Sequence, residues 1–99
     1  MKITLIGYGR MGKAIESLLG ADDQVVAKVH GSESLEKKVE KISKCDVAIE
    51  FSHPKSAFYN LNLCLDHGIP VVCGTTGWLD RFEEMRTLVA EKDGALFYA

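Results

Sequence analysis

The sequence predicts an α/β fold built on a parallel β-sheet, with helices covering both faces of the sheet. Strand-like and helix-like segments alternate along the chain, short connections join them, and no repeat, linker or low-complexity tract interrupts the alternation. The chain has 99 residues, of which 46% are hydrophobic, enough to form one packed core. We therefore expect a single doubly wound domain that spans residues 1–99.

The five predicted strands are short apolar runs, a composition typical of strands buried in a parallel sheet. They are Lys2–Ile6, Gln24–Val29, Asp46–Phe51, Val71–Cys73 and Ala95–Tyr98. The connection between the second and third strands is long enough for a helical crossover and too short to hold another strand. This predicts the strand order 2-1-3-4-5, which reverses beside the first strand.

Four segments between these strands repeat apolar residues at helical spacing. These residues are Met11, Ile15, Leu18 and Leu19, then Leu35, Val39 and Ile42, then Ala57, Phe58, Leu61, Cys64 and Leu65, and finally Phe82, Met85, Leu88 and Val89. We expect Ser52 to cap the third helix, with Pro54 in its first turn. Asp80 and Glu83 predict a capping box at the start of the fourth helix, which Gly94 ends.

A glycine-rich loop, "GYGRMG", follows the first strand and opens the first helix. This is a G-x-G-x-x-G pattern in the strand–turn–helix context that dinucleotide binding requires. Gly7 permits the tight turn, Gly9 lets a pyrophosphate approach the backbone, and Gly12 lets the helix pack close to the strand. The free N–H groups at the start of the helix then face the phosphates.

Two further loops belong to the same edge of the predicted sheet. The third strand runs into "FSHP" and the fourth into "GTTGW". Gly74, Thr75, Thr76 and Gly77 offer backbone donors and two hydroxyl groups without charge. Because the ligand crevice of such a sheet lies where the strand order reverses, we interpret these loops as ligand loops beside the glycine-rich loop.

The end of the second strand bears on the choice between NADPH and NADH. NAD-selective folds usually place an acid there, to accept a hydrogen bond from the ribose 2′-OH. The stretch reads "KVHGSE", and its first acid, Glu33, is expected beyond the strand, in the first turn of the next helix. His30 and Ser32, with Arg10 nearby, are donors that suit a 2′-phosphate. We predict that NADPH binds at least as well as NADH.

Composition excludes several other classes of protein. The net charge is −2 and the sequence pI is about 5.9, so the chain has no basic field for nucleic acid. The apolar runs are too short to span a membrane, and the N-terminus lacks the features of a signal peptide, which predicts a cytoplasmic protein. The three cysteines include no C-x-x-C pair, and the three histidines have no metal-ligand spacing. We expect Cys64 and Cys73 to be reduced core thiols.

The segments "MKITLIGYGRMGKAI", "DVAIEFSHP", "PVVCGTTGW" and "ALFYA" occur here in an order and spacing that resemble the N-terminal cofactor domain of the dihydrodipicolinate reductases. The resemblance covers essentially the whole chain and implies a Rossmann-like domain that stops before a substrate domain. It implies hydride transfer from NADPH or NADH to a cyclic dicarboxylate in lysine and diaminopimelate biosynthesis. It also implies a homotetramer for the full-length enzyme. The family's catalytic acid belongs to the substrate domain, so no catalytic residue is expected within residues 1–99.

The resemblance also implies roles for individual residues. The pyrophosphate would lie on the glycine-rich loop, formed by Gly7, Tyr8, Gly9, Arg10, Met11 and Gly12. Phe51 and Ser52 would line the nicotinamide side, and Ala99 would begin the stretch that meets the nicotinamide. Gly74, Thr75 and Thr76 would contact the cofactor, with Thr76 also contacting the substrate.

Two other classes of function stay open. Residues 1–99 taken alone favour a stand-alone dinucleotide-binding or sensing module, because no acid–base pair is expected near the crevice. A receiver or flavin-binding domain, which could share the strand order, fits less well. A receiver domain needs acidic residues directly after the first strand, where this chain has Gly7 and Tyr8, and the hydroxyl-rich phosphate loop that suits a flavin is absent there.

Overall fold

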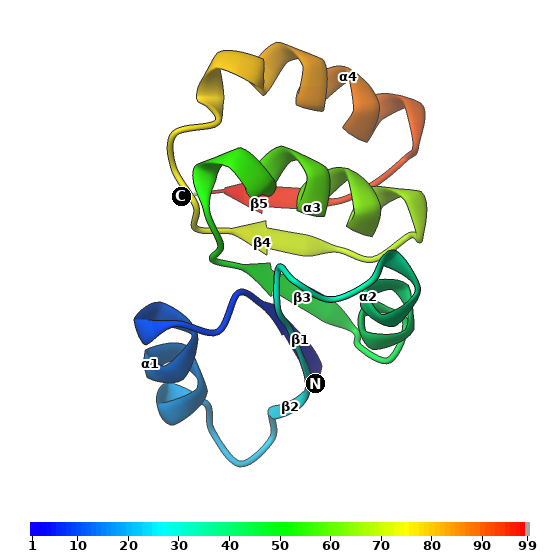
Figure 1. Ribbon diagram of the computed structural model, residues 1–99. Helices are drawn as coiled ribbons and strands as arrows, with labels where there is room; N and C mark the ends of the chain where they lie inside the picture. Colours follow the sequence, from blue (N-terminus) through cyan, green and yellow to red (C-terminus); the bar gives the residue numbers. More distant parts are fainter. Residues whose placement is uncertain (99) are drawn as a thin grey trace.

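The computed structural model describes residues 1–98, which form a five-stranded parallel sheet in the order β2-β1-β3-β4-β5 (Figure 1). The strands are β1 (Lys2–Ile6), β2 (Gln24–Val29), β3 (Val47–Glu50), β4 (Val71–Cys73) and β5 (Leu96–Tyr98). All four strand pairs are parallel. The predicted fold class and strand order are confirmed.

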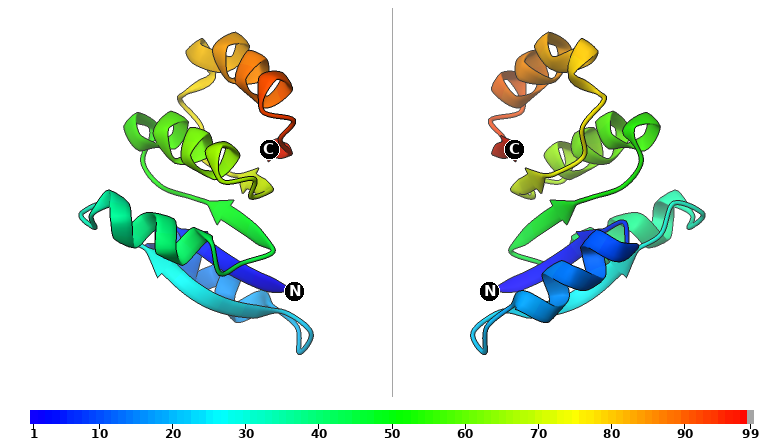
Figure 2. Two further views of the ribbon diagram at one scale, coloured as in Figure 1. Left: turned by 90° about the vertical axis from the view of Figure 1, so that its right-hand side faces the viewer. Right: turned by 90° about the vertical axis from the view of Figure 1, so that its left-hand side faces the viewer.

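Four α-helices and one 3₁₀-helix connect the strands, and they lie unequally on the two faces of the sheet (Figure 2). They are α1 (Arg10–Leu18), α2 (Leu35–Ile42), α3 (Pro54–Asp66), the 3₁₀-helix η1 (Leu79–Arg81) and α4 (Phe82–Glu91). The chain steps from β1 to β2 in one direction and from β2 through β3 and β4 to β5 in the other. Right-handed crossovers therefore place α1 on one face and α2, α3 and α4 on the opposite face.

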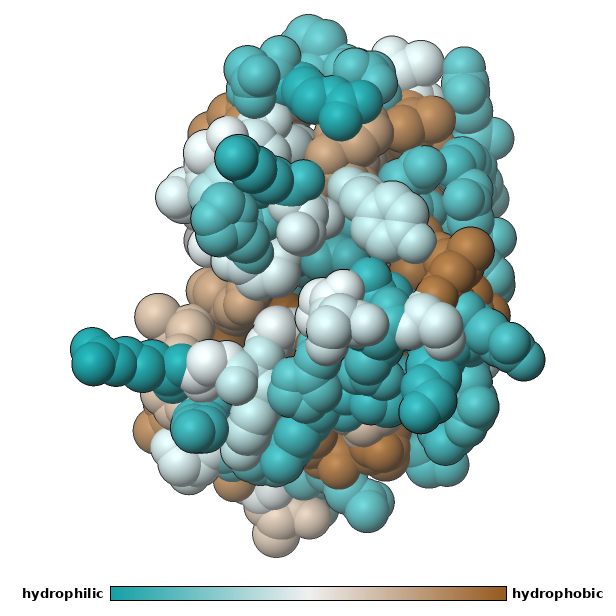
Figure 3. Space-filling model, viewed as in Figure 1, coloured by the Kyte–Doolittle hydropathy of each residue, from teal (hydrophilic) through white to brown (hydrophobic). Residues whose placement is uncertain are grey.

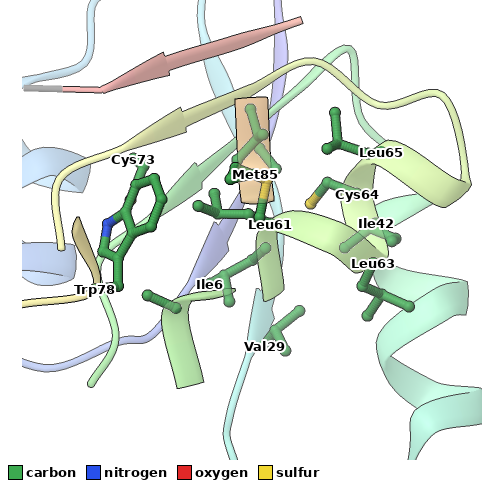
Figure 4. Close-up of a cluster of buried hydrophobic side chains, with 13 residues drawn as sticks. Ile6, Val29, Ile42, Leu61, Leu63, Cys64, Leu65, Cys73, Trp78 and Met85 are labelled. Carbon is green, nitrogen blue, oxygen red and sulfur yellow. The ribbon is translucent and has the colours of Figure 1, made fainter. Parts of the chain in front are cut away.

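The main core lies between the sheet and the three helices that share one face. Ile42 of α2, Leu61 and Cys64 of α3 and Met85 of α4 are all fully buried there, together with Ala48 of β3. Figure 4 shows this cluster, with Trp78 at one end of it. Burial raises the pKa of the Cys64 thiol to about 12, and both Cys64 and Cys73 are free and buried, as predicted.

Helices lie on both faces of the sheet, as predicted, but among the described residues they cover the face that carries α1 only in part. On the face that carries α1, Ile3 and Leu5 of β1 are buried. No helix within residues 1–98 covers β4 and β5 on that side, so Val72 is 37% exposed and Phe97 is 73% exposed. One helix about nine residues long cannot cover a five-stranded sheet.

The last strand is an edge strand, as the predicted strand order requires, but it is more exposed than its apolar run predicted. It begins at Leu96 and contacts only β4 along the sheet. Leu96 is half-buried, whereas Phe97 and Tyr98 are exposed. The apolar composition of this strand therefore indicated its conformation correctly and its burial wrongly.

Two predicted helix caps are also wrong. His53, not Ser52, caps α3, and its Nδ1 accepts a hydrogen bond from the backbone N–H of Lys55 at 3.3 Å. At α4 the 3₁₀-helix η1 comes first and no side chain caps the α-helix, so Asp80 and Glu83 form no capping box. Local spacing cannot tell which of several neighbouring polar side chains has a stronger partner elsewhere in the fold.

Hydrophilic side chains cover much of the surface seen from the viewpoint of Figure 1, and hydrophobic side chains appear there in smaller patches (Figure 3). Leu18, at the end of α1, is 83% exposed, and Met11 at its start is also exposed. No helix among residues 1–98 is long and apolar enough to cross a membrane.

Candidate cofactor site

The glycine-rich loop turns sharply at Gly7, directly after β1. Gly7 has a φ of +90°, a conformation that residues with a side chain rarely adopt. A Cβ at this position would lie 2.2 Å from the carbonyl oxygen of Phe51. The backbone N–H of Gly7 donates to the carbonyl of Val29 at 2.9 Å. The loop conformation and the close approach of β3 therefore both require glycine here.

The start of α1 is open in the way that a pyrophosphate requires. Gly9 is the N-cap residue and no side chain caps the helix, so side chains leave its first N–H groups free. A Cβ at Gly9 would meet no atom within 4 Å, whereas a Cβ at Gly12 would lie 2.8 Å from the carbonyl oxygen of Gly7. Gly9 thus leaves space for a ligand, and Gly12 lets the helix pack close to the strand. These residues fit a dinucleotide phosphate group.

Three loops that are distant in the sequence surround a hollow of about 250 Å³ beside the start of α1. The residues that line it are Met11, Phe51, Ser52, Pro54, Gly74, Thr75 and Thr76. The structure therefore brings together six of the residues predicted to contact the cofactor. The Phe51 ring packs against Gly74, where a Cβ would lie only 1.8 Å from the ring. We call this the β4-side hollow.

A second hollow of about 370 Å³ lies on the other side of the β3–α3 loop and also reaches Gly7. Its lining includes Lys38 of α2 and Lys55 and Tyr59 of α3. We call it the β2-side hollow, since Val29 and the following turn form one wall. Sequence reasoning missed these three side chains, because a lysine or tyrosine on a helix usually lies on a solvated surface.

The two hollows together give the site the shape of a dinucleotide-binding crevice. Both lie at the carboxyl ends of the strands, and Ser52 lines both of them. The glycine-rich loop contributes Gly7 to the β2-side hollow and Met11 to the β4-side hollow. A ligand that occupied both would pass over the start of α1, at the point where the strand order reverses.

None of the predicted 2′-phosphate donors lines either hollow: His30 and Ser32 follow β2, and Arg10 begins α1. His30 is exposed, and its backbone N–H donates to the carboxylate of Glu33 at 2.7 Å. Glu33 lies in the turn before α2, not in the first turn of the helix as predicted, and it pairs with Lys41 at 2.8 Å. These donors hold the pKa of Glu33 below its usual value. This carboxylate is therefore already engaged within the protein.

The side chain of Tyr8 is held on the outer side of the glycine-rich loop. Its hydroxyl donates to Glu16 of α1 at 2.5 Å, and the ammonium group of Lys28 lies 4.1 Å from the ring centroid. The Tyr8 hydrogen bond lowers the pKa of Glu16, and hydrogen bonding to Tyr8 also raises the pKa of Lys28. Through these two contacts Tyr8 links the glycine-rich loop to α1 and to β2.

Thr75 and Thr76 have different surroundings despite being neighbours. Thr75 is 8% exposed, and its hydroxyl accepts a hydrogen bond from the backbone N–H of Ser52 at 2.9 Å. The indole N–H of Trp78 donates to the Thr75 carbonyl at 2.8 Å. Thr76 is exposed. Of the two hydroxyl groups, only that of Thr76 lies on the open surface beside the hollow.

No titratable side chain lines the β4-side hollow in the part of the chain that the structure describes. Within residues 1–98 there is also no cluster of three or more His, Cys, Asp or Glu residues that could hold a metal ion. Ala99, another predicted cofactor contact, lies outside the described residues. The geometry can orient a ligand through backbone and hydroxyl groups, and it provides no acid or base in this hollow.

Solved structures with the same architecture share little sequence with this chain. A Sinorhizobium meliloti protein described as a candidate myo-inositol dehydrogenase matches 99% of the chain with a TM-score of 0.79 and 14% identity. A candidate oxidoreductase from Bacillus subtilis matches 99% of it with a TM-score of 0.74 and 19% identity. The chain covers 35% of each of these proteins. At such low identity the likeness establishes the fold alone.

Sequence comparisons identify the family. The family model described as dihydrodipicolinate reductase, N-terminus, matches residues 1–99. A 4-hydroxy-tetrahydrodipicolinate reductase from Christiangramia forsetii is 44% identical over 100 aligned residues, which cover all of this chain and 41% of that protein. One from Corynebacterium aurimucosum is 42% identical over 81 residues, or 79% of this chain and 32% of that protein. The chain thus spans less than half the length of these relatives, and it belongs to the dihydrodipicolinate reductase family as an N-terminal domain.

Proposed function

We propose that this chain is the cofactor-binding part of a 4-hydroxy-tetrahydrodipicolinate reductase that transfers hydride from NADPH or NADH to a cyclic dicarboxylate in lysine and diaminopimelate biosynthesis. The observation that carries the proposal is the open start of α1 at Gly9, with one hollow on each side of it. The match to the reductase family, together with relatives that carry this enzyme's name, supports the choice of reaction.

In this proposal the dinucleotide extends across the crevice. The pyrophosphate lies on the loop from Gly7 to Gly12, where the N–H groups and the dipole of α1 favour negative charge. The adenosine occupies the β2-side hollow, near Lys38 and Lys55. The nicotinamide occupies the β4-side hollow, against Phe51 and Ser52. The exposed hydroxyl of Thr76 faces the substrate, and Ala99 begins the segment that meets the nicotinamide.

The nicotinamide supplies the hydride when it is bound, and the protein supplies orientation. Reduction of the substrate also needs a proton donor, and no titratable side chain lines the β4-side hollow among the described residues. We therefore expect the 99-residue chain to bind cofactor without turnover. In the full-length enzyme we expect the remaining residues to supply the acid, the grip on the dicarboxylate and the contacts of a homotetramer, in the cytoplasm.

Calorimetric titration of the chain with NADPH tests the proposal. We expect saturable binding, together with a reductase activity at background. A second function is a stand-alone dinucleotide-binding or sensing module, which is favoured because none of residues 1–98 places a titratable side chain in the lining of the β4-side hollow. Reductase activity of the complete open reading frame would decide between the two. Absence of any NADPH or NADH binding would refute both, and turnover by the 99-residue chain would show that it contains an acid we have not identified.

We also propose that the site binds NADPH at least as well as NADH. Glu33, the acid nearest the end of β2, is paired with Lys41 and accepts from the His30 N–H, which leaves it poorly available to a ribose 2′-OH. His30 directly follows β2 and Arg10 is the first residue of α1, and both are exposed donors. We expect Arg10→Ala to weaken NADPH binding more than NADH binding, in parallel titrations. A clear preference for NADH that Arg10→Ala leaves unchanged would contradict this proposal.

A further inference from the structure

A buried carboxylate lies beneath the two loops that form the β4-side hollow. Glu50 is the last residue of β3 and is 0% exposed. No ion pair among the described residues includes it. A buried carboxylate without a cationic partner is costly unless hydrogen bonds compensate it. An acid of this kind beside a ligand hollow therefore needs an explanation.

Four side chains donate hydrogen bonds to Glu50. One carboxylate oxygen, Oε1, accepts from the Thr75 hydroxyl and, at 3.6 Å, from the Cys73 thiol. The other, Oε2, accepts from the Ser52 hydroxyl and, at 3.1 Å, from the Asn60 amide. These donors come from the β3–α3 loop, from α3, from β4 and from the loop after β4. Glu50 thus connects four segments at a single buried point.

The direction of these hydrogen bonds is determined by the rest of the network. The Thr75 hydroxyl already accepts from the Ser52 N–H, so its own proton points to Glu50. The Ser52 hydroxyl already accepts from the Asn60 amide at 3.1 Å, so its proton also points to Glu50. Both carboxylate oxygens thus act as acceptors of side-chain hydrogen bonds. A glutamine at this position would replace one of these oxygens with an NH₂ group, which would face other hydrogen-bond donors and leave them without an acceptor.

The network determines the shape of the β4-side hollow, since Ser52 and Thr75 both line it. Two backbone hydrogen bonds also hold these loops. The Gly74 N–H donates to the Glu50 carbonyl at 2.9 Å, and the Phe51 N–H donates to the Ile6 carbonyl of β1 at 2.9 Å. Every buried side-chain nitrogen and oxygen in residues 1–98 has a hydrogen-bond partner. The two loops are therefore held in one arrangement before any ligand arrives.

We propose that Glu50 is a positioning residue for the nicotinamide end of the cofactor. It does not touch the ligand. It holds the β3–α3 loop and the loop after β4 in the arrangement that receives the ring, which lowers the conformational cost of binding. This inference rests on the proposed function, because it takes the β4-side hollow as the nicotinamide site.

The test uses variants of the 99-residue chain titrated with NADPH well below their thermal midpoints. Glu50→Gln replaces one acceptor oxygen with an N–H donor and keeps the size of the side chain. We expect it to weaken NADPH binding by about tenfold or more, the effect of losing one hydrogen bond to a charged group. Glu91→Gln is the matched control, since Glu91 is exposed at the end of α4, and it should bind as the native chain does.

A double variant provides the rescue. In Glu50→Gln/Asn60→Asp the amide and the carboxylate exchange places, and the Ser52 hydroxyl can reverse its direction between them, so that the donors and acceptors match again. We expect the double variant to recover NADPH affinity to within about threefold of the native value. A purely structural effect of lost charge would instead lower the thermal midpoint and leave the affinity of the folded chain unchanged.

A spectroscopic readout reports the loop directly. Trp78 is the single tryptophan, and its indole donates to the Thr75 carbonyl at 2.8 Å. We expect its emission maximum to shift in folded Glu50→Gln and to return in the double variant. If Glu50→Gln does not fold, Thr75→Val replaces it, and the loss of this donor to Glu50 should both shift the Trp78 emission of the unliganded chain and weaken NADPH binding.

The outcomes separate this inference from the proposed function. If the native chain does not bind NADPH or NADH, the proposed function fails. If the native chain binds and folded Glu50→Gln binds equally well, only the positioning role of Glu50 is refuted. Loss of affinity without rescue in a folded double variant would also refute it, because the arrangement of donors would then not be what Glu50 provides.

Discussion

At the residue scale, the glycines of the loop after β1 divide into two physical classes. Gly7 has a positive φ and lies against the backbone of Phe51, so the fold itself requires it. Gly9 has a φ of −98° and nothing within 4 Å of a Cβ, so the fold does not. We predict that glycine matters at this position for a bound ligand and not for the fold. A single loop therefore contains one structural glycine and one ligand-dependent glycine.

This difference gives a prediction for Gly9→Ala. We expect it to weaken NADPH binding by about tenfold or more, since the methyl group enters the space needed for the pyrophosphate. We expect the free energy of unfolding to change by less than about 1 kcal/mol. Titration calorimetry and denaturant unfolding measure the two quantities on the same preparation.

Gly7→Ala is the matched control within the same loop. It should lower the free energy of unfolding by about 2 kcal/mol or more, through backbone strain and the clash with Phe51. If Gly9→Ala destabilises the chain as strongly as Gly7→Ala and its folded fraction binds NADPH normally, Gly9 is an ordinary turn residue and this reading of the loop is wrong.

At the element scale, α2 is attached to the sheet through Lys41. Its ammonium group donates to the carbonyl of Lys28 in β2 at 2.6 Å and pairs with Glu33 at 2.8 Å. The backbone carbonyl of Lys41 accepts from the Thr4 hydroxyl of β1 at 2.9 Å. One lysine thus links α2, the turn before it and two strands, and it engages the carboxylate of Glu33 within the protein.

We predict that Lys41→Met lowers the free energy of unfolding at neutral pH by about 1–2 kcal/mol, because it removes two hydrogen bonds made by a charged donor. The pKa of Glu33 is lowered in the folded state, so its contribution to stability is present above the unfolded value of about 4.3 and is lost as pH falls through the folded value. In urea unfolding from neutral to acidic pH, the free energy of unfolding should fall less steeply with falling pH in Lys41→Met than in the native chain. Identical slopes for the variant and the native chain would contradict this assignment.

At the scale of the whole molecule, the uncovered half of the sheet is the largest departure from a doubly wound domain with two covered faces. Val72 and Phe97 are exposed on the face that carries α1, and β5 is an unpaired edge among the described residues. Exposed apolar edges are templates for pairing with another chain. The isolated chain should therefore associate with itself.

We predict that the average mass of the native chain rises with concentration toward about millimolar, as measured by light scattering. Phe97→Lys should reduce this association, since it places a charge on the uncovered face. Leu18→Lys is the control, because Leu18 is equally apolar and 83% exposed at the end of α1. A native chain that stays monomeric at this concentration, or a reduction of the same size in both variants, would count against the uncovered face as the contact.

The sequence alone determined the features that depend on short-range patterns. Alternating apolar runs and short connections predicted the strand order, which the structure confirms. The G-x-G-x-x-G spacing placed the sharp turn at Gly7, and the loops after β1, β3 and β4 meet as predicted. The resemblance carried by these motifs identified the family, which the family model confirms over residues 1–99. The roles of individual residues toward cofactor and substrate remain predictions.

Only the tertiary structure decided which side chains find each other. Glu50 reads as one polar residue in an apolar strand, and nothing local shows that Ser52, Asn60 and Thr75 will donate to it. Ser52 does not cap α3, because its hydroxyl donates to Glu50. Glu33 is not available to a ligand, because it pairs with Lys41. How completely the helices cover each face of the sheet depends on the direction of every crossover at once. Such partners lie up to 25 residues apart in sequence, so register and packing, which no short pattern records, determine them.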